Sequence, residues 1–426
     1  MLLVHPPEEL TGLGLLPVGL SLLGGLAVVG VGGLLPGRRA GIQQERAVEV
    51  SPRTTREGLG LLRLWRSGGP FESWVGGLSR PQVATRAFAV VVLFFAIAAA
   101  RVGRDFQLEN IAPALVIGLA WPLLLLGSAI LGPIWRWLDP WDAVARAVET
   151  ENGAETPGED EAKGPNHSVW PAVLPALAWA WYLNAYSGSM DPRPLGAALA
   201  AYSLFMVAAC VAFGRQLWLS RTEVFGLLFG WTARLPRGQL VSWLPPAGAE
   251  ALIGVLAGGF IFGRIRVTAW WAELGGGPLF ALYSAAGVFV CAALGGALLW
   301  FLARRSAQVG AVGAAAAASV PALVSIALAV SMASSRLFNS LQLLPLLAGD
   351  PFGLGWDLLG TADWIVSTEP LGHVGLKVVQ MIVLLIGHVV GAIVLSRRVQ
   401  QPARAPALAA LALLFVPTLI AVAGTP

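Results

Sequence analysis

Long apolar runs alternate with arginine-bearing connectors along almost the whole of this chain. A helix needs about 20 apolar residues to cross a bilayer, because each residue adds about 1.5 Å and the hydrocarbon layer is about 30 Å thick. Ten runs approach this length: 15–35, 87–102, 111–131, 169–186, 195–213, 249–262, 278–302, 309–332, 374–395 and 407–422. The pattern predicts an all-α fold, a polytopic transmembrane helix bundle of about ten spans that forms one integral membrane domain over residues 1–426.

The composition supports a lipid environment and argues against a nucleic-acid partner. Of the 426 residues, 56% are hydrophobic and 12% are charged, whereas a soluble domain carries about 25% charged residues. The formal net charge is +4, and all 28 basic residues except Lys163 and Lys377 are arginines. They sit singly in connectors rather than in a stripe with interleaved aromatic residues, the pattern typical of nucleic-acid binding. The expected partner is the lipid bilayer.

The distribution of arginine predicts the orientation. Basic residues concentrate on the cytoplasmic side of a membrane protein. With both termini outside, the outer connectors hold only Arg101, Arg104, Arg193, Arg264, Arg266 and Arg336, and every other basic residue except Lys377 lies on the inner side. The chain is therefore predicted to be a multi-pass protein of the inner (plasma) membrane with its N- and C-termini outside. Tryptophans near the inner connectors, such as Trp135 and Trp141, are expected in the headgroup layer.

The run 249–262 is the weakest of the ten, because it is short and rich in glycine. Omitting it would invert the orientation of everything downstream and weaken the arginine bias. Gly254 and Gly258, and likewise Gly259 and Gly263, form pairs of small residues four positions apart. Such pairs allow two helix backbones to approach closely, so this run is predicted to pack tightly against other helices.

Three connectors are long enough to have a character of their own. Residues 37–86 form a basic cytoplasmic loop with an apolar and aromatic patch. Residues 149–164 are acidic and rich in glycine and proline, which predicts a disordered cytoplasmic linker. Residues 334–372 form the longest outer connector; they are mostly apolar and are expected to make a structured outer-face segment.

The ninth run carries the most unusual polar set, namely Lys377, Gln380 and His388. Lys377 and His388 are eleven positions apart, which places them on one face of a helix at about 100° per residue. Ionisable groups in hydrocarbon are costly and by default face a cavity or a partner. These residues are candidates for a polar site, although Lys377 can reach the outer surface and His388 can serve as an interhelical hydrogen-bond residue.

The outer connector contributes two further candidates, Asp350 and Asp357, in a stretch punctuated by glycines. Carboxylates in such a loop can bind a cation at the outer face. Their spacing matches no calcium-binding loop, however, and an aspartate often caps a turn by accepting backbone N–H groups. The two interpretations stay open here, with capping favoured.

No recognised catalytic pattern occurs in the sequence. There is no glycine loop followed by lysine for a nucleotide, no Gly-x-Ser-x-Gly, no His-x-x-x-His pair and no Cys-x-x-Cys. His373 and His388 would lie about 22 Å apart on one helix, which argues against a haem with two histidine ligands. We therefore assign no catalytic residue, no metal ligand and no cofactor.

Four segments nevertheless resemble a known family. They read GPIWRWLDPW (132–141), EVFGLLFGWTARL (223–235), GDPFGLGWDLLGTADW (349–364) and GHVVGAIV (387–394). In order and spacing the chain is similar to polytopic membrane proteins of actinobacteria and related lineages labelled fenitrothion hydrolase. The resemblance implies hydrolysis of organophosphate esters. A histidine that precedes the Asp-Pro motif in the family and a second one after the Gly-His motif are missing here, so only His388 and the Asp350 motif carry over.

Three functions are compatible with these observations. The chain most simply binds or moves a small solute or ion of unknown identity. It is alternatively a membrane subunit or assembly partner of a larger complex, with its apolar connectors as docking surfaces. A membrane-bound phosphotriester hydrolase is the third expectation, and it follows from the resemblance alone.

Overall fold

The computed structural model describes residues 79–148, 168–235, 239, 245–273, 279–307, 311–367 and 371–398. Within these ranges the chain is helical, and its one β contact is an isolated bridge between Ser168 and Ala247. The helices are α3 (Arg80–Val102), α4 (Ile111–Pro113), the π-helix η2 (Ala114–Ala120), α5 (Trp121–Leu131), α6 (Trp135–Leu138), α7 (Pro140–Val148), α9 (Trp170–Asn184), α10 (Pro192–Phe213), α11 (Arg215–Thr222), α12 (Val224–Thr232), α13 (Ala249–Ile265), α14 (Ala269–Glu273), α15 (Phe280–Ala307), α16 (Ala311–Gly349) and α17 (Gly372–Arg398).

The all-α prediction is confirmed for the described residues, and the membrane-crossing potential is confirmed for part of them. Four stretches are long and apolar enough to cross a bilayer: α3, the continuous stretch Ile111–Leu131, α10, and Phe280–Phe301 within α15. The predicted runs 15–35 and 407–422 lie outside the described residues, as do residues 37–78 of the basic connector and the acidic linker 149–164. The count of about ten spans therefore stays a prediction.

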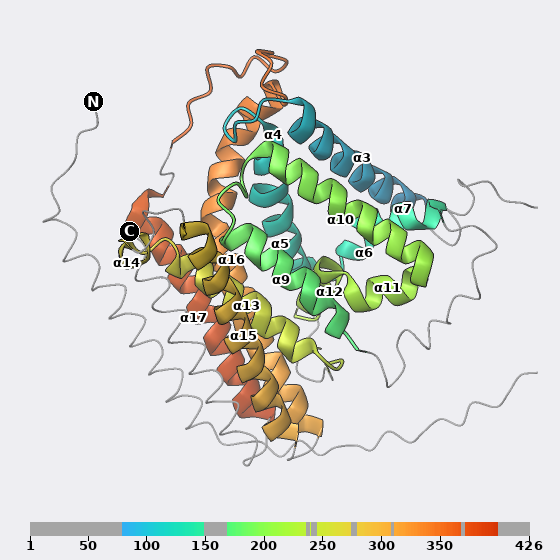
Figure 1. Ribbon diagram of the computed structural model, residues 1–426, viewed down its shortest axis with the longest axis vertical. Helices are drawn as coiled ribbons and strands as arrows, with labels where there is room; N and C mark the ends of the chain where they lie inside the picture. Colours follow the sequence, from blue (N-terminus) through green and yellow to red (C-terminus); the bar gives the residue numbers. More distant parts are fainter. Residues whose placement is uncertain are drawn as a thin grey trace, which may run out of the picture.

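The helices run between two opposite ends of the molecule (Figure 1). At one end, which we call the loop end, the backbone N–H of Arg104 donates to the carbonyl of Phe352, and Arg266 Nη1 donates to the carbonyl of Asn184. At the other end, the cluster end, Ser168 pairs with Ala247, and Arg86 Nη2 donates to the carbonyl of Arg136 at 3.0 Å. In the predicted orientation the loop end would face outward and the cluster end the cytoplasm.

Helix α13, the weakest of the predicted spans, lies at the centre of the bundle. All its residues from 251 to 262 are buried. A methyl group added at Gly254 or Gly258 would strike the backbone of Gly295 or Cys291 on α15 at 2.4 or 2.2 Å. The second glycine pair faces α9, where Gly259 lies against Ala180 and Gly263 against Asn184. The predicted close packing is therefore confirmed, with one glycine pair against each neighbour.

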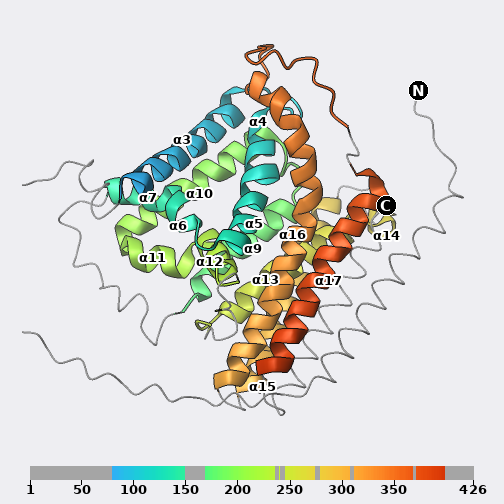
Figure 2. The ribbon, with the colours of Figure 1, turned by 180° about the vertical axis from the view of Figure 1, so that it is seen from behind.

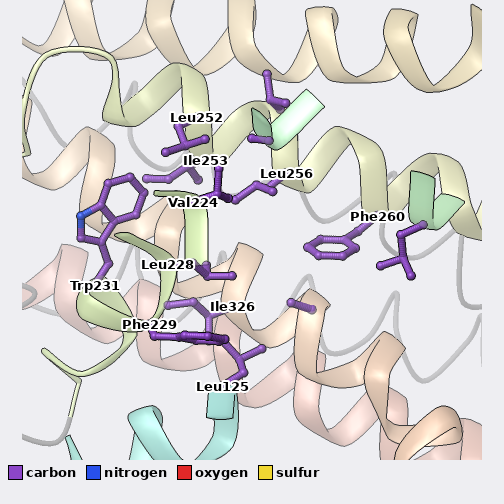
Figure 3. Close-up of a cluster of buried hydrophobic side chains, with 14 of the residues drawn as sticks. Leu125, Val224, Leu228, Phe229, Trp231, Leu252, Ile253, Leu256, Phe260 and Ile326 are labelled. Atoms are coloured by element: carbon purple, nitrogen blue, oxygen red, sulfur yellow. The ribbon is translucent and has the colours of Figure 1, made fainter. Parts of the chain in front are cut away.

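An apolar core fills the space where α5, α12, α13 and α16 meet (Figure 3). Phe229, Leu252 and Leu125 are fully buried there, and the Trp121 and Phe260 rings lie 5.7 Å apart. A cavity of about 20 Å³ opens in this core between Leu228, Trp231, Ile253, Leu256, Phe260, Ile326 and Ala329. That volume holds about one water molecule, and an apolar lining of this kind stays dry.

Helix α16 extends well beyond the predicted run 309–332. Its 39 residues span about 58 Å, nearly twice the hydrocarbon thickness, and it reaches the loop end beside α4 (Figure 2). The first half of the predicted outer connector is thus helical. The helix ends at Gly349 because Asp350 precedes Pro351, and a residue before proline is disfavoured in the α conformation. Residues 350–367 then form a loop held to the α3–α4 connection by the backbone bonds of Pro351 and Phe352.

Candidate functional site

The described residues with the densest buried charge lie at the cluster end, between α3, α7, α10, α11 and α12. At their centre is Asp142 on α7. Its carboxylate forms ion pairs with Arg86 of α3, with Arg146 one turn further along α7, and with Arg215 at the start of α11. Asp142, Arg86 and Arg215 are each less than 10% exposed. Three arginines from three helices thus converge on one carboxylate.

Two more buried carboxylates complete this charge cluster, and each caps a helix. Asp139 Oδ1 accepts the backbone N–H groups of Trp141 and Asp142, both at 3.0 Å, at the start of α7. Glu223 accepts the N–H groups of Phe225 and Gly226 at the start of α12. These carboxylates satisfy N–H groups that a helix terminus leaves without partners. The local fold therefore fixes their positions.

Aromatic side chains shield the cluster from solvent. The Trp141 ring lies 5.0 Å from Tyr202 and 6.0 Å from Phe225, and Trp141 Nε1 donates to Ser203 Oγ at 3.0 Å. Tyr202 in turn donates its hydroxyl to Glu223 Oε1 at 3.1 Å. Trp141 is 6% exposed, so its ring packs inside the protein, and its expected place at the depth of the headgroup layer stays a prediction. Arg86, assigned to the basic connector, likewise belongs to this buried cluster.

The three carboxylates of the cluster differ in their pKa values: Asp142 stays charged, whereas Asp139 and Glu223 can take up protons. Burial alone would raise the pKa of Asp142, but the charges of Arg215, Arg146 and Arg86 outweigh it and hold that pKa below its usual range. Burial, reinforced by the negative charge of Asp142, raises the pKa of Asp139 to about 7. Burial, reinforced by Asp139, raises the pKa of Glu223 to about 8. The three arginines balance the three carboxylates when all are ionised.

The polar residues predicted in the ninth run lie on α17. His388 is 1% exposed, and its Nδ1 lies 2.8 Å from the carbonyl oxygen of Leu384, so Nδ1 carries the proton in that bond. Gln380 is 2% exposed, and its backbone carbonyl accepts a hydrogen bond from Ser331 Oγ of α16 at 3.0 Å. Lys377 lies one turn before Gln380 and is half-buried. The apolar cavity includes none of these three residues.

Asp350 and Asp357 act as caps within the loop. Asp350 accepts the backbone N–H groups of Leu354 and Gly355 at 2.9 and 2.6 Å. Asp357 accepts those of Thr361 and Ala362 at 2.7 and 3.2 Å. These bonds match the capping interpretation. No group of three or more potential metal ligands occurs within the described ranges.

The sequence argument missed the charge cluster, although its residues border segments that the family resemblance had singled out. Asp139 lies near the end of the first of those segments, and Glu223 begins the second. Each is an acid placed directly before a helix, which is a readable capping signal. What the sequence did not reveal was their proximity to Arg86 and Arg215, because only the packing of α3 and α11 against α7 creates it.

Comparisons with known protein families, with characterised proteins and with solved structures gave no match for this chain. The family resemblance therefore stays a hypothesis. The function is inferred from the contacts of the chain's own residues.

Proposed function

We propose that this chain is a multi-pass membrane protein of about ten spans that binds or moves a small solute or ion, and that the ion is a proton exchanged at Asp139 and Glu223. One observation carries the proposal: two fully shielded carboxylates lie in a charge-balanced cluster with arginines at one end of an apolar helix bundle. Buried ionisable groups in a membrane protein are expensive and typically mark ion or proton pathways.

The division of roles within the cluster supports a proton in particular. Asp142 is held in its charged form by three arginines, and its charge acts on Asp139, which in turn acts on Glu223. Asp139 and Glu223 change protonation near neutral pH, which is what a proton-exchanging group requires.

The arginine bias supports placing this protein in the inner (plasma) membrane with both termini outside. In that orientation the charge cluster lies at the cytoplasmic end. Proton exchange would then take place between the cluster and the cytoplasm.

The test is proton flux into liposomes that contain the full chain and a pH-sensitive dye. We expect Asp139→Asn and Glu223→Gln each to lower the flux at least tenfold, because each removes a titrating group and keeps one oxygen acceptor for the cap. Glu109→Gln is the matched control, since Glu109 forms an exposed ion pair at the loop end. Equal flux in all four proteins, or no flux in the unaltered chain, would refute the proposal.

A second candidate is a membrane subunit of a larger complex. The observation in its favour is the loop 350–367, which exposes large apolar side chains although its backbone is held in place: Leu354, Trp356, Leu358, Leu359, Trp364 and Ile365. Co-purification of a stoichiometric partner after mild detergent extraction, lost when Trp356 and Ile365 are changed to serine, would favour this candidate. Phosphotriester hydrolysis has only the resemblance behind it, and we do not propose it.

A further inference from the structure

The loop end contains buried positive charge of a different kind from the cluster end. Arg264 lies in the last turn of α13, and Arg336 lies on α16. Both residues are half-buried, and the Nε and Nη2 atoms of Arg264 are buried without a hydrogen-bond partner. The helices α13 and α16 pack against each other, and burial, reinforced by the positive charge of Arg336, lowers the pKa of Arg264 to about 10. Two like charges are thus held together on neighbouring helices.

No carboxylate compensates this pair within the described part of the chain. The ion pairs of the described residues involve Arg86, Arg104, Arg146, Arg193 and Arg215, but neither Arg264 nor Arg336. The dipole at the C-terminus of α13 offsets only about half an elementary charge. Two guanidinium groups therefore keep most of their charge in a half-buried setting, where an unpaired charge is costly.

The surrounding residues add further positive charge at the same depth. The bond from Ser331 Oγ to the Gln380 carbonyl sets the register of α16 against α17. The helices α16 and α17 run in opposite directions (Figure 2). Arg336 follows Ser331 by five positions and Lys377 precedes Gln380 by three, so both lie further toward the loop end than that bond. Arg266 follows Arg264 by two positions and stacks over the ring of Phe280 at 5.7 Å. Arg266 and Lys377 are thus two further basic residues, at the end of α13 and on α17, toward the loop end.

The adjoining helix is irregular where it meets Arg336. The π-helix η2 packs along α16, and Gly118 lies directly against Ser340 and close to the backbone of Arg336. A π-helix is a strained element that is common at functional sites. Gly118 is required there because a methyl group would come within 1.8 Å of Ser340 Oγ. The small residue Gly118 therefore lets η2 pack closely against α16 next to Arg336.

We propose that Arg264 and Arg336 form a binding site for a phosphate group at the loop end of the bundle. The planar guanidinium fork donates parallel hydrogen bonds to two oxygens of an oxyanion, and two such forks suit a doubly charged group. The phosphate is either a free ion or the headgroup of a lipid. This site goes beyond the proton exchange proposed above, and it lies at the opposite end of the molecule.

The first arm of the test titrates inorganic phosphate into the full chain in a neutral, phosphate-free detergent, with calorimetric detection. We expect saturable binding that weakens about tenfold or more in Arg264→Gln and in Arg336→Gln, because each loses charge-assisted hydrogen bonds. Arg193→Gln should bind as the unaltered chain does, since Arg193 is an exposed residue of the same end. Arg336→Lys keeps the charge without the fork and should retain part of the affinity, which guards against misreading an unfolded variant.

The second arm places the same proteins in nanodiscs of phosphatidylcholine with or without phosphatidic acid, and measures the unfolding temperature. If the phosphate belongs to a lipid, phosphatidic acid will raise that temperature in the unaltered chain and in Arg193→Gln but not in Arg336→Gln. A response in either arm that depends on both arginines supports the site. If neither probe distinguishes the unaltered chain from Arg264→Gln and Arg336→Gln, the site is refuted, whatever the result of the proton-flux measurement.

Discussion

The two ends of this bundle bury arginine in opposite ways. At the cluster end, Arg86 and Arg215 converge on Asp142, and two further acids balance the remaining charge. At the loop end, Arg264 and Arg336 lie together without a carboxylate partner among the described residues. A buried charge must be compensated. The difference teaches that described residues supply the counter-charge at one end, whereas at the other it would come from the phosphate group that we propose.

The largest expected effect is at the balanced end. Asp142→Asn removes the negative partner of two buried arginines and of the half-buried Arg146, and it should lower the free energy of unfolding by about 3–5 kcal/mol. Unfolding in detergent, followed by tryptophan fluorescence, measures the change. Glu109→Gln breaks an exposed ion pair and should change stability far less. Similar losses in the two variants would remove the distinction between a balanced buried cluster and a surface pair.

At the loop end we expect a change of the opposite sign in the free energy of unfolding. Arg336→Met keeps an unbranched side chain and removes one of two repelling charges, so in phosphate-free buffer it should raise the free energy of unfolding by about 1–3 kcal/mol. Arg215→Met at the cluster end should instead destabilise, because it leaves Asp142 with fewer partners. The same denaturation experiment measures both variants. A loss of stability in Arg336→Met comparable to that in Arg215→Met would mean that Arg336 is compensated after all.

A change of pH should have a smaller effect on the stability of the fold, and this effect should arise at the cluster end alone. Asp139 and Glu223 have pKa values raised to about 7 and about 8 in the folded chain, so folding favours their protonated forms. Stability should therefore fall as the pH rises from about 4 to about 8. Asp142 affects the stability in the opposite direction. Its pKa is lowered in the folded chain, so it contributes stability that is lost only as the pH falls into the acid range.

The unfolding temperature across buffers from about pH 5 to about pH 9 measures this dependence. Glu223→Gln should flatten the curve, whereas Arg336→Gln at the other end should leave its slope unchanged. A slope that Glu223→Gln does not alter would show that the cluster is not the titrating element.

Several helices could be placed from the sequence because a helix that crosses a bilayer needs a continuous run of apolar residues, which is visible in the sequence itself. The predicted run 195–213 lies within α10, and the run 111–131 matches the stretch from α4 to α5. The ends of the helices were less predictable. An apolar run indicates only the part of a helix that would lie in the hydrocarbon layer, whereas the helix itself continues until a capping residue or a helix-breaking residue ends it. Thus α3 begins at Arg80, where Gln82 Oε1 accepts the backbone N–H of Ser79, and α16 continues to Gly349.

The charged sites were harder to predict for a physical reason. Arg215 and Asp142 are 73 positions apart, and nothing in the local sequence of either indicates the other. Their meeting depends on how α7 and α11 pack, which no periodicity records. The candidates taken from the sequence, His388 and Asp350, stood out because they are rare residues in apolar or glycine-rich surroundings. Their described hydrogen bonds to nearby backbone atoms of the same segment explain their local role and give no sign of a shared site.

The central position of α13 has a consequence for how the protein is made. During synthesis α9 precedes α13, but α15, which will cover the face with Gly254 and Gly258, has not yet left the ribosome. That glycine face must therefore wait in contact with lipid or the insertion machinery until its partner emerges. We expect α9 and α13 to enter the membrane as a pair, so that a nascent chain ending after α13 is held less firmly than one that includes α15.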